Sequence, residues 1–140
     1  MFFDRKTVLY QIVSKNNHKK KVYSTSKESR KYPVTILVNE YSASASEIIT
    51  SCFLDNYRSI NVVGSKTYGK GSVQNYRTLF SGRGIKYTIE GWLTSKGKSI
   101  DGKGIKPNYE VELSDEYFQS PSYKTDNQFQ KALELSKKSH

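Results

Sequence analysis

The chain has 140 residues and a mass of 16.0 kDa, which suits a single domain. Its 23 Lys and Arg residues against 13 Asp and Glu residues give a net charge of +10, and the 13% aromatic content indicates a folded core. No apolar run reaches the roughly 20 residues of a membrane helix, and the first residues lack the pattern of a signal peptide. With one cysteine, Cys52, and two histidines, His18 and His140, an internal disulfide is excluded and a Cys-rich or His-based metal site is not expected.

The first 31 residues predict a β-hairpin followed by a polar connector. Residues 7–13 and 21–24 are rich in β-forming types and flank a polar turn, and residues 24–31 have no apolar pattern. The densest basic run, residues 18–21, lies at the turn. Such a run could neutralise phosphates, so a basic nucleic-acid-binding domain is the least favoured alternative function. Solvated surface lysines explain the charge, and no nucleic-acid partner is expected.

A strand, a helix and a second strand are predicted next. The apolar run 34–38 is typical of a strand buried on both faces of a parallel sheet. A helix is expected to begin at Ser44, because Ser44 and Glu47 have the spacing of a capping box. A strand over 60–63, ending at Gly64, completes a βαβ unit with a right-handed crossover. The expected buried face of the helix consists of Ala45, Ile48, Ile49, Cys52 and Phe53.

The second half of the chain is predicted to be rich in strands. Residues 72–80 and 85–93 flank a short Gly-containing turn and predict a second hairpin. A Gly-rich polar segment, 95–104, precedes a short strand at 109–113 and an amphipathic helix at 127–136. Alternation in the hairpin predicts half-buried side chains at Ile85, Tyr87, Ile89 and Leu93.

Ser44 allows two interpretations. A serine between a buried strand and a helix can present its hydroxyl at the sheet edge, where the helix N-terminus stabilises an oxyanion. The other interpretation is that Ser44 only caps the helix. The local pattern leaves both open.

Lys70 lies between Gly69 and Gly71 in a stretch that is close to a phosphate-binding P-loop. The motif requires Ser or Thr directly after the lysine, where this chain has Gly71, and a helix, where a strand is predicted; we therefore reject it. An amine in a desolvated cleft is more easily neutral and can take the proton of a serine hydroxyl, whereas an exposed lysine is only a surface charge. Because His18 lies at a hairpin turn and His140 ends the sequence, the base of any serine chemistry is not expected to be a histidine, which favours Lys70.

Three segments in this order resemble the C-terminal processing peptidases, also called tail-specific proteases. They are VTILVNEYSASASEI (34–48), TYGKGSVQ (67–74) and WLTSKGKSIDGKGIKPN (92–108), within a resemblance that runs from about residue 31 to 113. The resemblance implies an α/β fold related to the crotonase and Clp-protease spiral, here a βαβ unit plus β-hairpins. It also implies serine endopeptidase activity without a cofactor.

Carried over residue by residue, the resemblance makes Ser44 the nucleophile and Lys70 its general base. It implies that Gln74 orients the lysine and that the Ala45 backbone N–H donates to the oxyanion. Lys70 and Gln74 would be about 13 Å apart in a fully extended chain at roughly 3.3 Å per residue, so direct contact needs a bend at Gly69 or Gly71. The implied substrates are proteins or peptides cleaved near their C-terminal ends, outside the cytoplasm, in the cell envelope or after secretion.

The family pattern also predicts how the chain is divided. Residues 1–140 are expected to form one partial catalytic domain: a hairpin and connector (1–31), the core with the motifs (32–113) and a tail with a helix (114–140). The family's PDZ domain and the Gly-rich segment that gives the second oxyanion donor would precede Met1. The chain alone is therefore expected to be weakly active or inactive, since losing one donor costs about 10²–10³ in turnover. A non-catalytic binding module of the same fold is the main alternative, and exposed strand edges favour a homo-oligomer.

Overall fold

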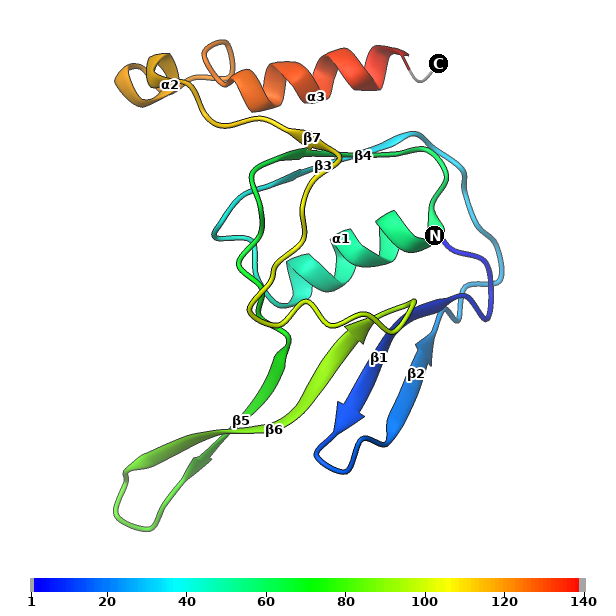
Figure 1. The fold of residues 1–140 in the computed structure, drawn as a ribbon, viewed down its shortest axis with the longest axis vertical. Helices are drawn as coiled ribbons and strands as arrows, with labels where there is room; N and C mark the ends of the chain where they lie inside the picture. The colour runs from blue at the N-terminus through cyan, green and yellow to red at the C-terminus, as the bar shows by residue number, and fades with distance from the viewer. Residues whose placement is uncertain (1, 139–140) are drawn as a thin grey trace.

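Helices and sheets alternate in layers in the computed structural model, which describes residues 2–138 (Figure 1). Helix α3 (Asn127–Lys138) covers one face of a parallel sheet, helix α1 (Ala45–Asn56) lies beneath the other face, and an antiparallel sheet lies below α1. This is the mixed α/β architecture that the sequence predicts. No helix among residues 2–138 combines the length and apolar character that crossing a membrane requires.

The parallel sheet has the strand order β3 (Val34–Val38), β4 (Ile60–Gly64), β7 (Tyr109–Glu110), and α1 connects β3 to β4. The predicted βαβ unit is thus confirmed. Val62 and Val63 on the central strand are fully buried because helices cover both faces. The prediction that both faces are buried is wrong for the edge strand β3, where Leu37 is 44% exposed.

Helix α1 is buried differently from the prediction. Cys52 and Phe53 are buried as expected, but Ala45 and Ile49 are exposed. The helix contacts both sheets, so its buried surface is wider than one apolar stripe and includes Glu47, Thr50 and Ser51. The two hydroxyl groups donate to backbone carbonyls within the helix, which allows them to be buried.

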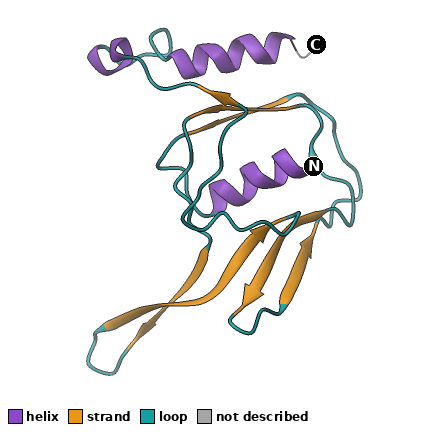
Figure 2. Cartoon of the chain, viewed as in Figure 1, coloured by secondary structure: helices purple, strands orange, loops and turns teal. Residues whose placement is uncertain are grey.

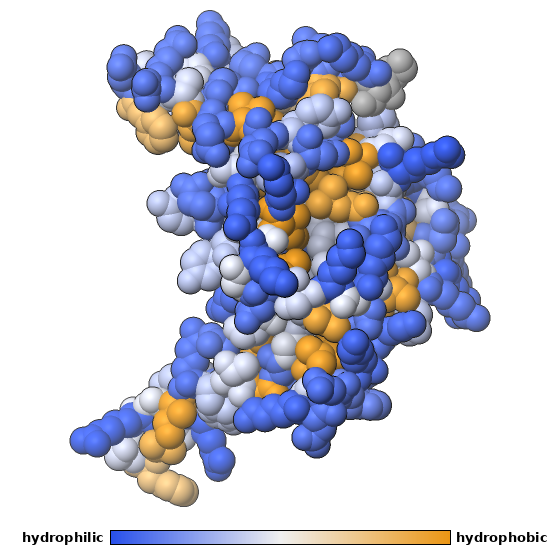
Figure 3. All heavy atoms as spheres, in the orientation of Figure 1, coloured by the Kyte–Doolittle hydropathy of each residue, from blue (hydrophilic) through white to orange (hydrophobic). Residues whose placement is uncertain are grey.

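The antiparallel sheet has the order β2 (Lys19–Tyr23), β1 (Val8–Ser14), β6 (Gly84–Thr94), β5 (Ser72–Thr78), which confirms both predicted hairpins. Only the C-terminal part of β6 pairs with β1; the rest of the β5–β6 hairpin projects from the body (Figure 2). Apolar side chains are therefore visible on this projection in Figure 3. The predicted half-burial is wrong for Ile85, Tyr87 and Ile89, which are exposed.

The segments after β6 return to the core. Ile100 and Ile105 pack with Trp92, and Val111 packs with Val63 and the α3 residues Ala132 and Leu135. The strand predicted at 109–113 is limited to Tyr109–Glu110, whereas the terminal helix is slightly longer than predicted. A short helix, α2 (Asp115–Gln119), was not predicted.

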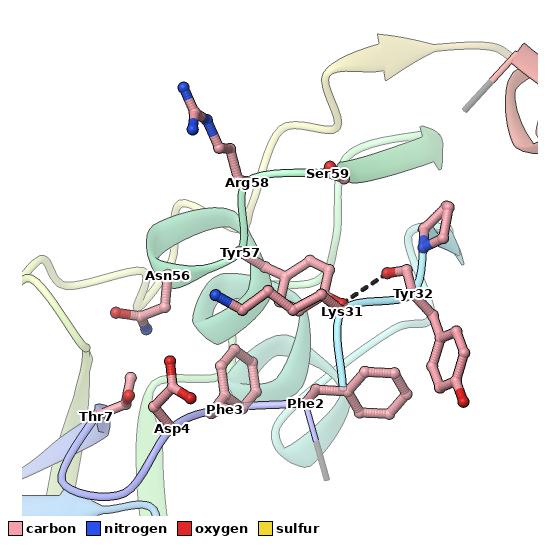
Figure 4. A pocket seen from close by; sticks show the side chains of 11 residues that line it. Phe2, Phe3, Asp4, Thr7, Lys31, Tyr32, Asn56, Tyr57, Arg58 and Ser59 are labelled. Atoms are coloured by element: carbon pink, nitrogen blue, oxygen red, sulfur yellow. Dashed lines mark hydrogen bonds between the residues drawn. The ribbon is translucent and has the colours of Figure 1, made fainter. Parts of the chain in front are cut away.

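The N-terminal segment packs against the C-terminal end of α1. Phe2 and Phe3 contact Phe53, with ring centroids 5.3 and 4.8 Å apart, and Tyr57 completes the cluster. The cavity beside this cluster has a volume of about 340 Å³, and the Tyr57 hydroxyl donates to the Tyr32 carbonyl at its edge (Figure 4). None of the predicted site residues lines it, because they lie toward the other end of α1.

Candidate active site

Ser44 has a strained backbone at the point where β3 leads into α1. Its φ of 56° and ψ of −114° fall in a region that residues other than glycine rarely adopt, at a cost of about 1–3 kcal/mol. The predicted capping box with Glu47 is present, but an ordinary cap residue has an extended backbone. Capping alone therefore does not account for the conformation of Ser44, which resembles the sharp strand-to-helix turn that exposes a nucleophile.

Ala45 follows as the first residue of α1. N–H groups in the first turn of a helix have no acceptor within the helix, and the positive end of the helix dipole lies there. The position of the Ala45 N–H beside Ser44 is thus compatible with the predicted oxyanion role.

Glu47 is fully buried and joins the Ser44 turn to the Lys70 loop. Its Oε2 accepts the backbone N–H groups of Ser44 at 2.9 Å and Lys70 at 2.8 Å. Its Oε1 accepts the Gly69 N–H and the Thr67 hydroxyl, both at 2.6 Å. Four donors thus satisfy a carboxylate that would otherwise be costly to bury. From the sequence Glu47 was expected only to cap the helix; its spacing from Thr67 and Lys70 gave no signal of this second role.

The loop 69–71 has a partner for every backbone polar group. Beyond the two N–H groups bonded to Glu47, the Gly71 N–H donates to Asp101 Oδ1 at 2.8 Å. The three carbonyls accept, in order, the Gly102 N–H at 2.9 Å, the Trp92 Nε1–H at 2.9 Å and the Trp92 backbone N–H at 2.8 Å. The backbone on both sides of Lys70 is therefore fixed, although two of the three residues are glycines.

Close backbone contacts explain those glycines. A Cβ atom on Gly69, whose φ is +90°, would lie 2.6 Å from the Gly104 nitrogen, and one on Gly71 would lie 2.7 Å from the Asp101 Cβ. Only glycine fits at either position.

Ser44, Lys70 and Gln74 all line one cavity of about 430 Å³, together with residues of β1 and β6 that include Trp92. Ser44 and Lys70 are half-buried, whereas Gln74 on β5 is exposed. Within residues 2–138, no hydrogen bond joins Lys70 to Ser44 or to Gln74, and no carboxylate lies within ion-pair distance of Lys70. The fold thus brings the three predicted residues to one cavity, but in the described chain no hydrogen bond joins Gln74 to Lys70.

No histidine within residues 2–138 lines this cavity. His18 lies in the turn between β1 and β2, and His140 lies outside the described residues. In the described part of the chain, no three His, Cys, Asp or Glu side chains gather as metal ligands would.

Comparisons with known proteins show which family the chain resembles. The model of peptidase family S41 matches residues 1–111. The chain is 42% identical over 115 residues to a "Probable CtpA-like serine protease" of Staphylococcus saprophyticus, covering 80% of this chain and 23% of that protein. It is 49% identical over 86 residues to the protein of the same name in Staphylococcus aureus, covering 61% of this chain and 17% of that protein.

A solved structure is also similar. The photosystem II D1 C-terminal processing protease superposes with a TM-score of 0.69 at 26% sequence identity, covering 80% of this chain and 29% of that one. The chain therefore spans about a quarter of the length of the relatives that it matches.

Proposed function

Because the chain belongs to peptidase family S41, we propose that it carries the catalytic dyad of a serine endopeptidase core, with Ser44 as nucleophile and Lys70 as general base. One observation supports the proposal above all: both residues line one cavity, and the Glu47 carboxylate holds the backbone N–H groups of both. The strained backbone of Ser44 adds to it, since strain of this kind gathers at functional sites.

In the proposed first step, the neutral amine of Lys70 takes the hydroxyl proton of Ser44 while Oγ attacks the substrate carbonyl carbon. The negative charge that develops on the carbonyl oxygen is stabilised by the Ala45 N–H at the start of α1. The peptide C–N bond then breaks, the departing amine takes the proton from Lys70, and an acyl-enzyme ester remains on Ser44. Water, deprotonated by Lys70, hydrolyses the ester and releases the new carboxylate and Ser44.

The substrate class follows from the family. The resemblance and the name of the D1 C-terminal processing protease support cleavage near the C-terminal ends of proteins. A location in the cell envelope or outside the cell is proposed from the family resemblance alone. Gln74 is proposed to orient Lys70 once substrate fills the cavity, since hydrogen bonds between catalytic groups are often long or absent without a ligand.

Labelling with a fluorophosphonate tests the dyad. We expect the 140-residue chain to be modified slowly at Ser44, in line with the weak activity expected without a second oxyanion donor, with the site located by mass spectrometry. Labelling should disappear in Ser44→Ala and Lys70→Ala. Ser46→Ala is the matched control, because Ser46 is an exposed serine two positions further along α1. Its labelling should equal that of the unmodified chain.

Two outcomes would contradict the proposal. Labelling that survives in Ser44→Ala would place the reactive serine elsewhere. An unmodified chain that is folded by circular dichroism but is not labelled would favour the non-catalytic binding module.

A further inference from the structure

The Gly-rich segment 95–104 returns to the loop that carries Lys70. The Gly102 N–H donates to the Gly69 carbonyl at 2.9 Å, on the N-terminal side of Lys70. On the C-terminal side, Asp101 Oδ1 accepts the Gly71 N–H at 2.8 Å. The two segments therefore hold each other on both sides of the proposed base.

Asp101 is the residue of this segment whose side chain bonds the loop. Its own backbone N–H donates to the Ser99 hydroxyl at 3.3 Å, and the neighbouring turn is closed by Lys103 and Gly104 N–H groups that donate to the carbonyl of buried Ile100. The carboxylate is thus presented from a well-anchored turn. No Lys, Arg or His in residues 2–138 forms an ion pair with Asp101.

Asp101 is not a residue of the core, so its side chain can act on the Lys70 loop without supporting the fold. The residue is exposed, and it lines a cavity of about 530 Å³ together with Lys70 and Gln74. Little apolar area depends on its side chain, so its removal should cost the fold little. Its hydrogen bond, by contrast, acts on the residue directly after Lys70.

We propose that Asp101 is a positioning residue for the general base. By accepting the Gly71 N–H it fixes the backbone that follows Lys70, and with it the direction in which the Lys70 side chain enters the cavity shared with Ser44. Gly71 needs this support because it has no Cβ and a wide choice of backbone conformations. The inference rests on the proposed dyad.

The test uses the 140-residue chain with Asp101→Ala and Asp101→Asn, since asparagine keeps an acceptor oxygen for the Gly71 N–H and removes only the charge. We expect Asp101→Ala to lower the maximal rate of fluorophosphonate labelling of Ser44 at least about tenfold, because small misplacements of catalytic groups cost this much or more. The probe concentration for half-maximal rate should not change, and the urea midpoint of unfolding should fall only by the effect of one lost hydrogen bond. Asp101→Asn should restore the rate to within about twofold.

Asp115→Ala is the matched control. It removes an exposed aspartate from α2, away from the cavity, and should label at the rate of the unmodified chain. Hydrogen exchange at the Gly71 amide gives an independent readout, which should accelerate about tenfold or more in Asp101→Ala and recover in Asp101→Asn.

Each contrary result has a distinct meaning. If Asp101→Ala labels as fast as the unmodified chain, the positioning role is wrong while the dyad stands. If Asp101→Asn is as slow as Asp101→Ala, the carboxylate acts by its charge and the hydrogen-bond proposal is wrong. If neither the unmodified chain nor Asp115→Ala is labelled, the proposed dyad fails, and the inference fails with it.

Discussion

The backbone N–H groups of Ser44 and Lys70 both donate to the same atom, Glu47 Oε2, at 2.9 and 2.8 Å. The two residues lie on different segments, one at the start of α1 and the other between β4 and β5. A fully buried carboxylate thus sets the separation of the two backbones, in an interior where side chains have little freedom to shift.

Glu47→Gln should destabilise the chain and slow labelling of Ser44. Either orientation of the glutamine amide turns an NH₂ group toward two of the four donors, so buried hydrogen-bonding groups lose their partners. The expected loss is roughly 2–4 kcal/mol in the free energy of unfolding, measured by urea denaturation. Glu116→Gln, at an exposed position on α2, is the control and should change little. Equal stability of the two variants would show that the Glu47 network contributes nothing.

Gly69→Ala should destabilise the chain more than Gly82→Ala. Both glycines have positive φ, +90° and +77°, so both substitutions introduce backbone strain of about 1–2 kcal/mol. Only at Gly69 would the new Cβ also meet backbone, 2.6 Å from the Gly104 nitrogen, whereas nothing lies within 4 Å at Gly82. We expect an additional loss of about 1–3 kcal/mol at Gly69, from paired urea unfolding curves. If both variants lost the same free energy of unfolding, the packing of the Lys70 loop against Gly104 would make no contribution to stability.

Trp92→Phe should weaken the support of the Lys70 backbone, whose carbonyl accepts a hydrogen bond from Trp92. The substitution removes the Nε1–H that donates to the Lys70 carbonyl and reduces the volume of a side chain that is 2% exposed. A loss of about 1–3 kcal/mol and a slower labelling of Ser44 are expected. Because Trp92 is the one tryptophan of the chain, unfolding is followed by circular dichroism. Unchanged labelling at full stability would mean that this hydrogen bond does not position Lys70.

Cys52 should react with thiol reagents only after unfolding. Burial raises the pKa of its thiol from 9.0 to about 11, with the hydrogen bond from Asn56 acting in the opposite direction and the charge of Asp55 adding to the rise. Little thiolate therefore forms in the folded chain at pH 8. Ellman's reagent should give no colour within minutes at this pH, and one equivalent of thiol in urea. Rapid reaction of the folded chain would show that Cys52 is accessible.

The same shift makes stability fall at alkaline pH. Between about pH 9 and pH 11 the unfolded thiol ionises while the folded thiol keeps its proton, so the folded state binds more protons and loses stability as pH rises. The protonated Cys52 thiol contributes about 2–3 kcal/mol to the free energy of unfolding. This stabilisation is fully present below pH 9 and lost above pH 11. Cys52→Ala should show a correspondingly shallower decline in urea unfolding over this range. Parallel curves would contradict the raised pKa.

Local patterns predicted most elements. Periodicity and turn residues are properties of short segments, and the two hairpins, the strands 34–38 and 60–63 and the helix after Ser44 were accordingly recovered. Errors arose where burial depends on distant segments. Ile85, Tyr87 and Ile89 alternate as a half-buried strand should, yet their part of the hairpin extends beyond the layers that would cover it.

The candidate site, like the fold, has features that the sequence predicts and features that only the tertiary structure decides. The motifs around Ser44, Lys70 and Gln74 predict the family from their order in the sequence. They also predict the residue types proposed for the chemistry, because both depend on side-chain identity at fixed spacings. The sequence alone could not indicate that Glu47, 23 positions before Lys70, would accept the backbone N–H groups of Ser44 and Lys70. Nor could it indicate that Asp101, 30 positions after Gly71, would accept the Gly71 N–H. Those bonds exist only once β4, α1 and the Gly-rich segment 95–104 are packed together, since a buried polar group is satisfied by whatever the fold brings near it and not by its neighbours in the chain.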